Sequence, residues 1–214
     1  MVQSDPVAGY CKYGFHLDAL MNKKIRLAIF ASGSGTNAEA IMNYFQHHPK
    51  MEVVVLLSNN AHALALERAK NFNVPSLIFD KQQLGETHEV LDWLTKYQVT
   101  HLVLAGFLWL LPERLIQAFP DKIINIHPSL LPKFGGKGMF GIRVHEAVKA
   151  AGELETGITI HVVNAKYDEG RILRQAKCKI LGSDSPQEIA RKVYALEYAN
   201  YPKTIEEWAL TGEE

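Results

Sequence analysis

Residues 25–38 read IRLAIFASGSGTNA, and this stretch decides the fold. It opens with an unbroken apolar run, passes through a loop with glycine at positions 33 and 35, and enters an amphipathic segment. An apolar run without polar alternation is typical of a strand buried on both faces, as in a parallel sheet covered by helices. The stretch therefore predicts a strand, a tight turn and a helix, which together form the first part of a βαβ unit.

The same alternation continues along the chain. Further apolar runs of strand length occur at residues 51–58, 76–79, 101–107 and 122–127. The amphipathic stretches that predict helices lie at residues 36–46, 61–72, 85–97 and 112–119. Strands that alternate with helices predict an α/β fold, with an open, mostly parallel, twisted sheet and helices on both faces in a Rossmann-like arrangement.

The C-terminal part follows a different pattern. After a predicted helix at residues 144–151, two apolar runs at 156–163 and 171–181 are separated by only a short segment. A short connection joins antiparallel strands, because a parallel pair needs a long crossover. A last helix is predicted from Pro186 onward, with Pro202 as a kink or a restart.

Length and composition limit the domain count and the class of protein. The chain has 214 residues with 23 basic and 23 acidic side chains, which predicts one domain at 25–214 after an irregular arm at 1–24. Zero net charge lacks the basic excess of nucleic-acid binders, and no apolar run reaches the roughly 18 residues that span a bilayer. Two distant cysteines, Cys11 and Cys178, indicate reduced thiols in a cytoplasmic protein. We therefore expect small-molecule chemistry without nucleic-acid or membrane partners.

The glycine loop fits an anion better than a dinucleotide. Residues 33–38 satisfy the spacing G-x-G-x-x-A, but an NAD site also needs an acidic residue about 20 positions later, where residues 58–60 read Ser-Asn-Asn. The nearest arginine, Arg68, lies inside the following predicted helix, so an NADP site is no better supported. Glycines at a helix N-terminus with adjacent side-chain donors favour one phosphate monoester. The alternative is a tight turn capped by Thr36, with no ligand.

Three polar residues are candidates for catalysis. Asn125 and His127 lie two apart on a predicted strand, so their side chains leave the same face, and Pro128 keeps His127 extended. An amide beside an imidazolium could stabilise the oxyanion of a carbonyl under attack. Asp168 could keep His127 protonated and accept, directly or through water, the proton that an attacking amine releases. The alternatives are a packed strand histidine and an ordinary turn aspartate beside Gly170.

Other kinds of site find little support in the sequence. The chain lacks G-x-S-x-G, and Cys178 lies in a predicted strand without a local histidine, which disfavours an acyl-enzyme. The pair His47 and His48 and the single histidines at 101, 145 and 161 lack metal-ligand spacing, so no metal is expected. The segment from Pro128 to Ile142 is rich in Pro, Gly and Lys and is predicted to be a functional loop.

Five motifs together point to a known family. They are ASGSGTN at 31–37, LAGF at 104–107, NIHPSLLPKFGGKG at 125–138, TGITIHVV at 156–163 and YDEGRIL at 167–173. With them the chain resembles the phosphoribosylglycinamide formyltransferases, folate-dependent enzymes of purine synthesis, from about Ile25 to Trp208. NIHPSLLP followed some forty positions later by D-x-G is specific to the formyltransferase superfamily. The sequence departs from the family at 84–88, where LGETH lacks an expected arginine, and in a longer loop at 135–143.

The resemblance implies a reaction. The formyl group of 10-formyltetrahydrofolate, a co-substrate, would pass to the amine of glycinamide ribonucleotide by direct attack through a tetrahedral intermediate, without metal or NAD. Asn125, His127 and Asp168 would be the catalytic set. The domain would have a phosphate-binding half at about 25–120 and a folate-binding and catalytic half at about 121–210, and the protein would be a monomer or a homodimer.

The resemblance also implies two groups of binding residues. The ribonucleotide phosphate would be held by Gly35, Thr36 and Asn37, and the rest of that substrate by Pro128 and Glu197. The folate would contact Leu108, Trp109, Leu110, Leu111, Asn125, Asn164, Ala165, Lys166, Tyr167 and Asp168. Lys137 and Arg143 in the long loop could meet the folate glutamates, or they could simply be solvated loop charges.

Three other functions use parts of the same pattern. A methionyl-tRNA formyltransferase should carry an additional C-terminal domain and a basic surface. A formyltetrahydrofolate deformylase should have an N-terminal regulatory domain and typically reads NIHH, whereas Pro128 follows His127 here. A phosphometabolite sensor without catalysis would keep the glycine loop but has no use for Asn125, His127 and Asp168 together.

Overall fold

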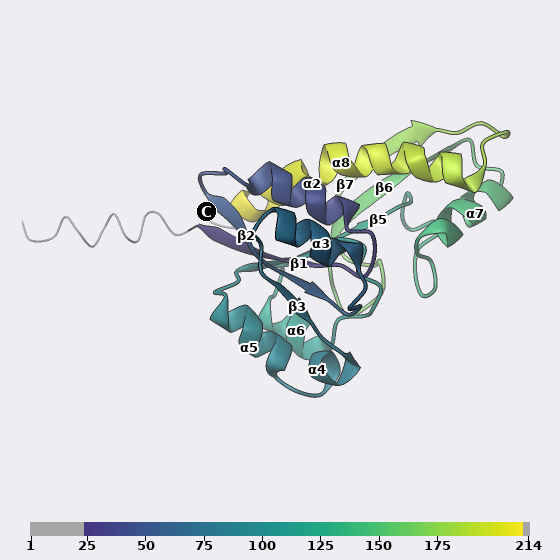
Figure 1. Ribbon diagram of the computed structural model, residues 1–214. Helices are drawn as coiled ribbons and strands as arrows, with labels where there is room; N and C mark the ends of the chain where they lie inside the picture. Colours follow the sequence, from purple (N-terminus) through teal and green to yellow (C-terminus); the bar gives the residue numbers. More distant parts are fainter. Residues whose placement is uncertain (1–23, 212–214) are drawn as a thin grey trace, which may run out of the picture.

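A computed structural model describes residues 24–211 of the chain (Figure 1). In chain order its elements are β1 (Ile25–Phe30), α2 (Thr36–Phe45), β2 (Met51–Ser58), α3 (Leu64–Asn71), β3 (Ser76–Ile78), α4 (Lys81–Gly85), α5 (Glu89–Lys96), β4 (His101–Leu104), α6 (Glu113–Ala118), β5 (Ile123–His127), α7 (Ile142–Ala150), β6 (Glu155–Val162), β7 (Ile172–Lys179) and α8 (Pro186–Thr211). Cys11 and all of the expected N-terminal arm except Lys24 lie outside the described residues.

The strands form one seven-stranded sheet in the order β3-β2-β1-β4-β5-β6-β7. The five strands from β3 to β5 are parallel, whereas β6 runs antiparallel to both β5 and β7. This arrangement confirms the predicted mostly parallel, Rossmann-like sheet with antiparallel C-terminal strands. The strand order reverses between β1 and β4, so the carboxyl ends of β1, β4 and β5 meet at the edge where open α/β sheets bind ligands.

Helices cover both faces of the sheet, as Figure 1 shows, with α2, α3, α7 and α8 on one side and α4, α5 and α6 on the other. Strand β1 shows why its sequence has to be apolar throughout. Leu27 and Ile29 point into the first core, whereas Ala28 and Phe30 point into the second, and all four side chains are fully buried. A strand with two covered faces cannot alternate polar and apolar residues without burying unpaired polar groups.

The structure differs from the predicted elements in two places. Helix α4 was not expected, since its five residues show no periodicity and its N-terminus depends on a capping box between Asp80 and Gln83. The predicted restart at Pro202 is wrong, because α8 continues through it as one helix to Thr211. The missing N–H of Pro202 leaves the Tyr198 carbonyl without its helix partner, and Tyr198 is an exposed residue. Within residues 24–211, no helix combines the length and apolar character needed to cross a membrane.

Candidate active site

Strand β5 places Asn125 and His127 on one face at its carboxyl end, as predicted. His127 is buried, and its Nε2–H donates to the carbonyl oxygen of Phe134 at 2.8 Å. Asn125 lies opposite His161 in the antiparallel pairing with β6, and its Nδ2 donates to Nε2 of His161 at 3.1 Å. The Nδ1–H of His161 donates to the Val162 carbonyl at 3.0 Å, which leaves Nε2 as the acceptor. One N–H of the Asn125 amide is thereby fixed, and the second stays available for another acceptor.

Asp168 joins these residues from the connection between β6 and β7. Its Oδ2 lies 3.5 Å from Nδ1 of His127 and its Oδ1 lies 3.7 Å from Nε2 of His161. Both distances are too long for hydrogen bonds, so they describe electrostatic contacts. The Gly136 N–H donates to Oδ2 at 2.8 Å, and this bond ties the long loop to the carboxylate. Asp168 has a left-handed φ of 56°, a conformation that Asp tolerates better than most residues.

Burial and charge oppose each other within this cluster. Burial raises the pKa of the Asp168 carboxyl, but the facing His161, the His127 charge and the Gly136 N–H together hold the pKa below its ordinary value. Burial lowers the pKa of His127 by more than Asp168 and the Phe134 carbonyl raise it. Asp168 thus favours the protonated form of His127, as expected, but burial opposes it and is the larger of the two effects.

His161 belongs to the cluster but was not among the residues selected from the sequence. It was considered only as an isolated histidine without metal-ligand spacing, and its partner Asn125 is 36 positions away. The predicted antiparallel pairing of the two strands could have identified it, because this pairing places His161 opposite Asn125. Among residues 24–211, no three His, Cys, Asp or Glu side chains are grouped in a way that could hold a metal ion.

The glycine loop ends at an N-terminus of α2 that no side chain caps. Gly35, with φ 70°, is the N-cap residue, so Thr36 does not cap the helix. A Cβ at Gly35 would lie 2.5 Å from Cα of Ala65, so α3 packs directly against the loop and excludes a side chain there. The first N–H groups of a helix need acceptors from outside it, and an uncapped N-terminus leaves them available to an anion.

Asn37 and Glu197 are brought together from opposite ends of the chain. Asn37 Nδ2, in the first turn of α2, donates to Glu197 Oε2 of α8 at 2.7 Å. The Asn37 Oδ1 atom is buried and has no partner among the described residues. Glu197 is only 5% exposed, and burial raises the pKa of its carboxyl to about 7, although the Asn37 bond lowers it. The two residues thus lie beside the helix N-terminus that the glycine loop forms.

The remaining expected ligand residues lie near the same edge of the sheet with very different exposure. Leu108 and Leu110 are 47% and 42% exposed, whereas Leu111 is buried in the core between the sheet and α6. Trp109 packs against Phe79 and Phe107 and faces the Lys81 ammonium at 5.7 Å. The remaining expected residues are exposed or half-buried: Pro128, Asn164, Ala165, Lys166 and Tyr167, together with Lys137 and Arg143.

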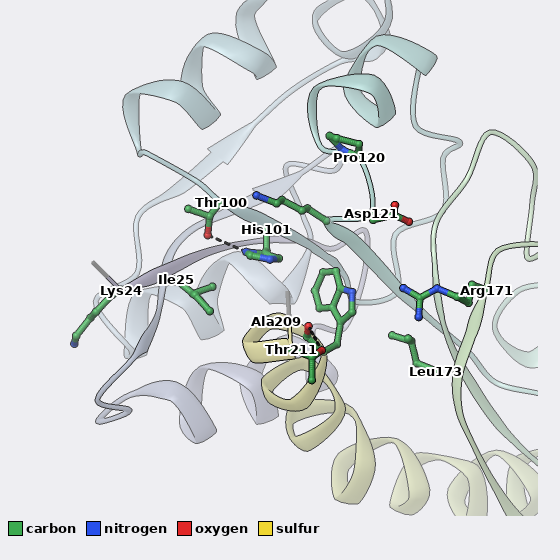
Figure 2. A pocket seen from close by; sticks show the side chains of 12 residues that line it. Lys24, Ile25, Thr100, His101, Pro120, Asp121, Arg171, Leu173, Ala209 and Thr211 are labelled. Carbon is green, nitrogen blue, oxygen red and sulfur yellow. Dashed lines mark hydrogen bonds between the residues drawn. The ribbon is translucent and has the colours of Figure 1, made fainter. Parts of the chain in front are cut away.

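A cavity of about 430 Å³ lies at the opposite end of the sheet (Figure 2). Its lining includes His101 at the start of β4, Arg171 and Leu173 near the start of β7, and Ala209 and Thr211 at the end of α8, as Figure 2 shows. None of the residues expected at the catalytic or ligand sites lines this cavity. The candidate active site is therefore defined by its polar cluster and by the uncapped helix, both at the carboxyl edge of the sheet.

Comparisons with known proteins identify the family of the chain. A family model described as formyl transferase matches residues 25–205. A phosphoribosylglycinamide formyltransferase of Arabidopsis thaliana, described as chloroplastic, is 40% identical over 189 residues, which are 86% of this chain. The chain spans 65% of the length of that relative. Another, from Haemophilus influenzae, is 34% identical over 192 residues, covering 87% of this chain and 88% of the relative. The crystal structure of phosphoribosylglycinamide formyltransferase from Anaplasma phagocytophilum is similar with a TM-score of 0.78 at 33% identity, covering 86% of each chain.

Proposed function

The chain belongs to the formyl transferase family, and from this premise we propose that it is a phosphoribosylglycinamide formyltransferase. It transfers the formyl group of 10-formyltetrahydrofolate to the amine of glycinamide ribonucleotide, a step of de novo purine biosynthesis. The observation that carries the proposal is the meeting of Asn125, His127 and Asp168 at the carboxyl end of β5. These groups suit acyl transfer without a covalent nucleophile.

The catalytic residues act on charge and on protons. The amine nitrogen attacks the formyl carbon and forms a C–N bond, while the carbonyl oxygen becomes an oxyanion. The free N–H of Asn125 donates to that oxygen. The developing negative charge raises the pKa of His127, so that its Nδ1 takes up a proton from solvent and the imidazolium adds a positive charge near the oxyanion. Asp168 accepts the ammonium proton, directly or through water. The intermediate then collapses as the bond to the folate nitrogen breaks, and that nitrogen takes up a proton.

The ribonucleotide spans from the glycine loop to β5. Gly35, Thr36 and Asn37 hold its phosphate at the N-terminus of α2, and Pro128 and Glu197 contact the rest of it. The proposal is supported by the order of the strands, because only β4 separates β1 from β5. With neighbouring strands about 4.8 Å apart, the phosphate site lies on the order of 10 Å from the catalytic cluster. That distance suits a ribose with one substituent at each end.

The folate binds on the other side of the cluster. An apolar wall for the pterin is provided by the exposed side chains of Leu108 and Leu110, and polar edges are provided by the segment 164–168. Trp109 and Leu111 pack in the core and support that wall. Lys137 in the long loop and Arg143 in the first turn of α7 are exposed cations that can meet the folate glutamates. This assignment divides the domain into a phosphate-binding half at about 25–120 and a folate-binding and catalytic half at about 121–210.

The proposal also includes partners and location. The partners are the two small molecules alone, without nucleic acid, and the protein acts as a monomer or homodimer in the cytoplasm. The low number of cysteines supports that location. Light scattering of the purified full chain and fractionation of its source cells test these two points.

A formyl-transfer assay tests the function. The purified full chain should consume 10-formyltetrahydrofolate only when glycinamide ribonucleotide is present. Asp168→Asn should lower the rate by about 10² to 10⁴, because the charge and the proton acceptor are lost together. Asp121→Asn is a matched control, since Asp121 has the same left-handed φ of 56° but lies at the opposite end of the sheet. Its rate should stay unchanged.

Other outcomes would identify other functions. Release of formate without ribonucleotide would identify a deformylase, and transfer to a charged tRNA alone would identify a tRNA formyltransferase. Ribonucleotide binding without any turnover would leave a sensor. Equal activity of the Asp168→Asn and Asp121→Asn variants would return Asp168 to the role of an ordinary turn residue. A formylated protein found by mass spectrometry after incubation with the folate alone would contradict direct transfer.

A further inference from the structure

Three consecutive carbonyl groups of the glycine loop are held by one neighbouring segment, which runs from the end of β2 into α3. The Asn60 side-chain Nδ2 donates to the Ser32 carbonyl oxygen at 3.2 Å. The backbone N–H of Ala65 donates to the Gly33 carbonyl oxygen at 3.2 Å. The guanidinium Nε of Arg68 donates to the Ser34 carbonyl oxygen at 2.9 Å. Each bond fixes the orientation of one peptide group in the loop.

Because the peptide bond is planar and trans, the direction of each carbonyl also fixes the direction of the following N–H group. The C=O of one residue and the N–H of the next point in opposite directions. With the three carbonyls turned toward α3, the N–H groups of Gly33, Ser34 and Gly35 must point away from it. None of these three N–H groups has a protein acceptor among residues 24–211. Together with the uncapped first turn of α2, they form a set of unpaired donors suited to an anion.

We propose that Arg68 is a positioning residue for the ribonucleotide phosphate, which it serves by holding the Ser34–Gly35 peptide with its N–H turned toward the phosphate. This inference rests on the proposed function and extends it to a residue outside the motif. The sequence places Arg68 inside a helix, apart from the loop, but its side chain crosses the space between α3 and α2. Its Nε bonds the loop, and its Nη1 pairs with Glu39 in the first turn of α2.

The local charges favour a geometric role over a direct electrostatic one. The Arg68 cation is paired with Glu39, so the pair adds little net charge at the phosphate site. The Arg68 and Glu39 side chains are 29% and 41% exposed, and surface ion pairs of this kind contribute at most about 1 kcal/mol to stability. Losing Arg68 should therefore leave the fold intact. What the variant loses is the restraint on one peptide, and with it the alignment of the Gly35 N–H.

The experiment compares two ligands that differ only in the phosphate. Calorimetry measures the binding of glycinamide ribonucleotide and of its dephosphorylated riboside to the full chain and to Arg68→Met. We expect the dissociation constant of the ribonucleotide to rise by about 5- to 10-fold, as for the loss of one hydrogen bond. The riboside should bind both proteins equally. In the transfer assay, the Michaelis constant for the ribonucleotide should rise while turnover and the Michaelis constant for the folate change less than about twofold.

Two further variants separate positioning from a merely structural role. Arg68→Lys keeps a donor that can reach the Ser34 carbonyl and should restore part of the affinity. Glu39→Gln breaks the ion pair but leaves the Nε bond, so it should not weaken ribonucleotide binding. The inference would be overturned if Arg68→Met lost the same affinity for the ribonucleotide and the riboside. It would also be overturned if Arg68→Met and Glu39→Gln lost the same affinity for the ribonucleotide. Unchanged affinity in Arg68→Met, with a wild type that binds and turns over the ribonucleotide, would also overturn it and leave the proposed function intact. A wild type that binds no ribonucleotide would overturn the proposed function itself.

Discussion

Replacing Glu197 by Gln should change how the stability of the protein depends on pH. The side chain is 5% exposed and has one hydrogen-bond donor, Asn37, so its charged form is poorly solvated. Burial raises the pKa of its carboxyl from 4.5 to about 7. In the unfolded chain the carboxyl ionises near its ordinary value, whereas in the folded chain it stays protonated up to about pH 7.

The size of the effect follows from linkage between protonation and folding. The stability contributed by protonated Glu197 is fully present below pH 4.5 and is lost as the pH rises through the folded pKa near 7. At 1.36 kcal/mol for each pKa unit, the total loss is about 3 kcal/mol and is complete by about pH 8. The Glu197→Gln side chain would keep an amide oxygen for the Asn37 bond but would not titrate. Between pH 4.5 and 8, the free energy of unfolding of the variant should therefore rise relative to that of the wild type by about 3 kcal/mol.

Urea unfolding followed by tryptophan fluorescence at several pH values measures this difference. Subtracting the wild-type free energy of unfolding from that of Glu197→Gln at each pH cancels the titration of every other group. The same substitution at Glu169, whose side chain is 62% exposed, is the matched control and should show no comparable slope, because that carboxyl remains in water. A Glu197 difference that stays constant from pH 4.5 to 8 would refute the reasoning, since it would mean that the carboxyl is not desolvated in the folded protein.

Three further predictions concern the catalytic cluster and the loop. Asn125→Ala should lower turnover by about 10² to 10³ with smaller changes in the Michaelis constants, because the lost hydrogen bond forms only in the transition state; a change in binding alone would contradict this in steady-state kinetics. The double variant of His127→Ala with Asp168→Asn should lose far less turnover than the product of the two single-variant losses, because the residues act as a unit. A loss of turnover equal to that product would show that they act independently. Gly35→Val should lower the melting temperature, because its Cβ meets Ala65 at 2.5 Å; an unchanged melting temperature would show that α3 can move away.

The fold was largely predictable because its information is local. An apolar run buried on two faces identifies each central strand by itself, and the short segment before Arg171 is enough to predict that β6 and β7 are antiparallel. Helix α4 was missed because five residues are too few to show a helical periodicity of apolar residues. Its N-terminus is defined by the hydrogen bonds between Asp80 and Gln83. The restart at Pro202 was wrong because α8 stays one continuous helix, although proline lacks the N–H of a helix bond, and the helix packs against the core along its length.

The site was less predictable because its contacts join distant parts of the chain. Asn125 and His127 could be selected from spacing, but the contact between Asn125 and His161 depends on the register of an antiparallel pair. The direction of the His127 pKa shift could not be predicted either, since the balance between burial and the Asp168 charge exists only in the folded protein. Arg68 reaches the loop only because α3 packs against α2, a contact without a sequence signature.

The register between β5 and β6 also determines which part of this protein can change in length during evolution. Asn125 and His161 are held opposite each other by the ladder of the sheet, so inserting one residue in either strand would turn one of them to the opposite face. The loop between Lys137 and Gly141 lies outside the sheet ladder, and the bonds to His127 and Asp168 come from Phe134 and Gly136, which precede it. Only Met139 of this loop packs against the core. Insertions there can lengthen the loop and vary its contacts with a ligand without moving the reacting groups. A change in loop length should thus alter the contacts of Lys137 with a ligand and leave the chemistry unchanged.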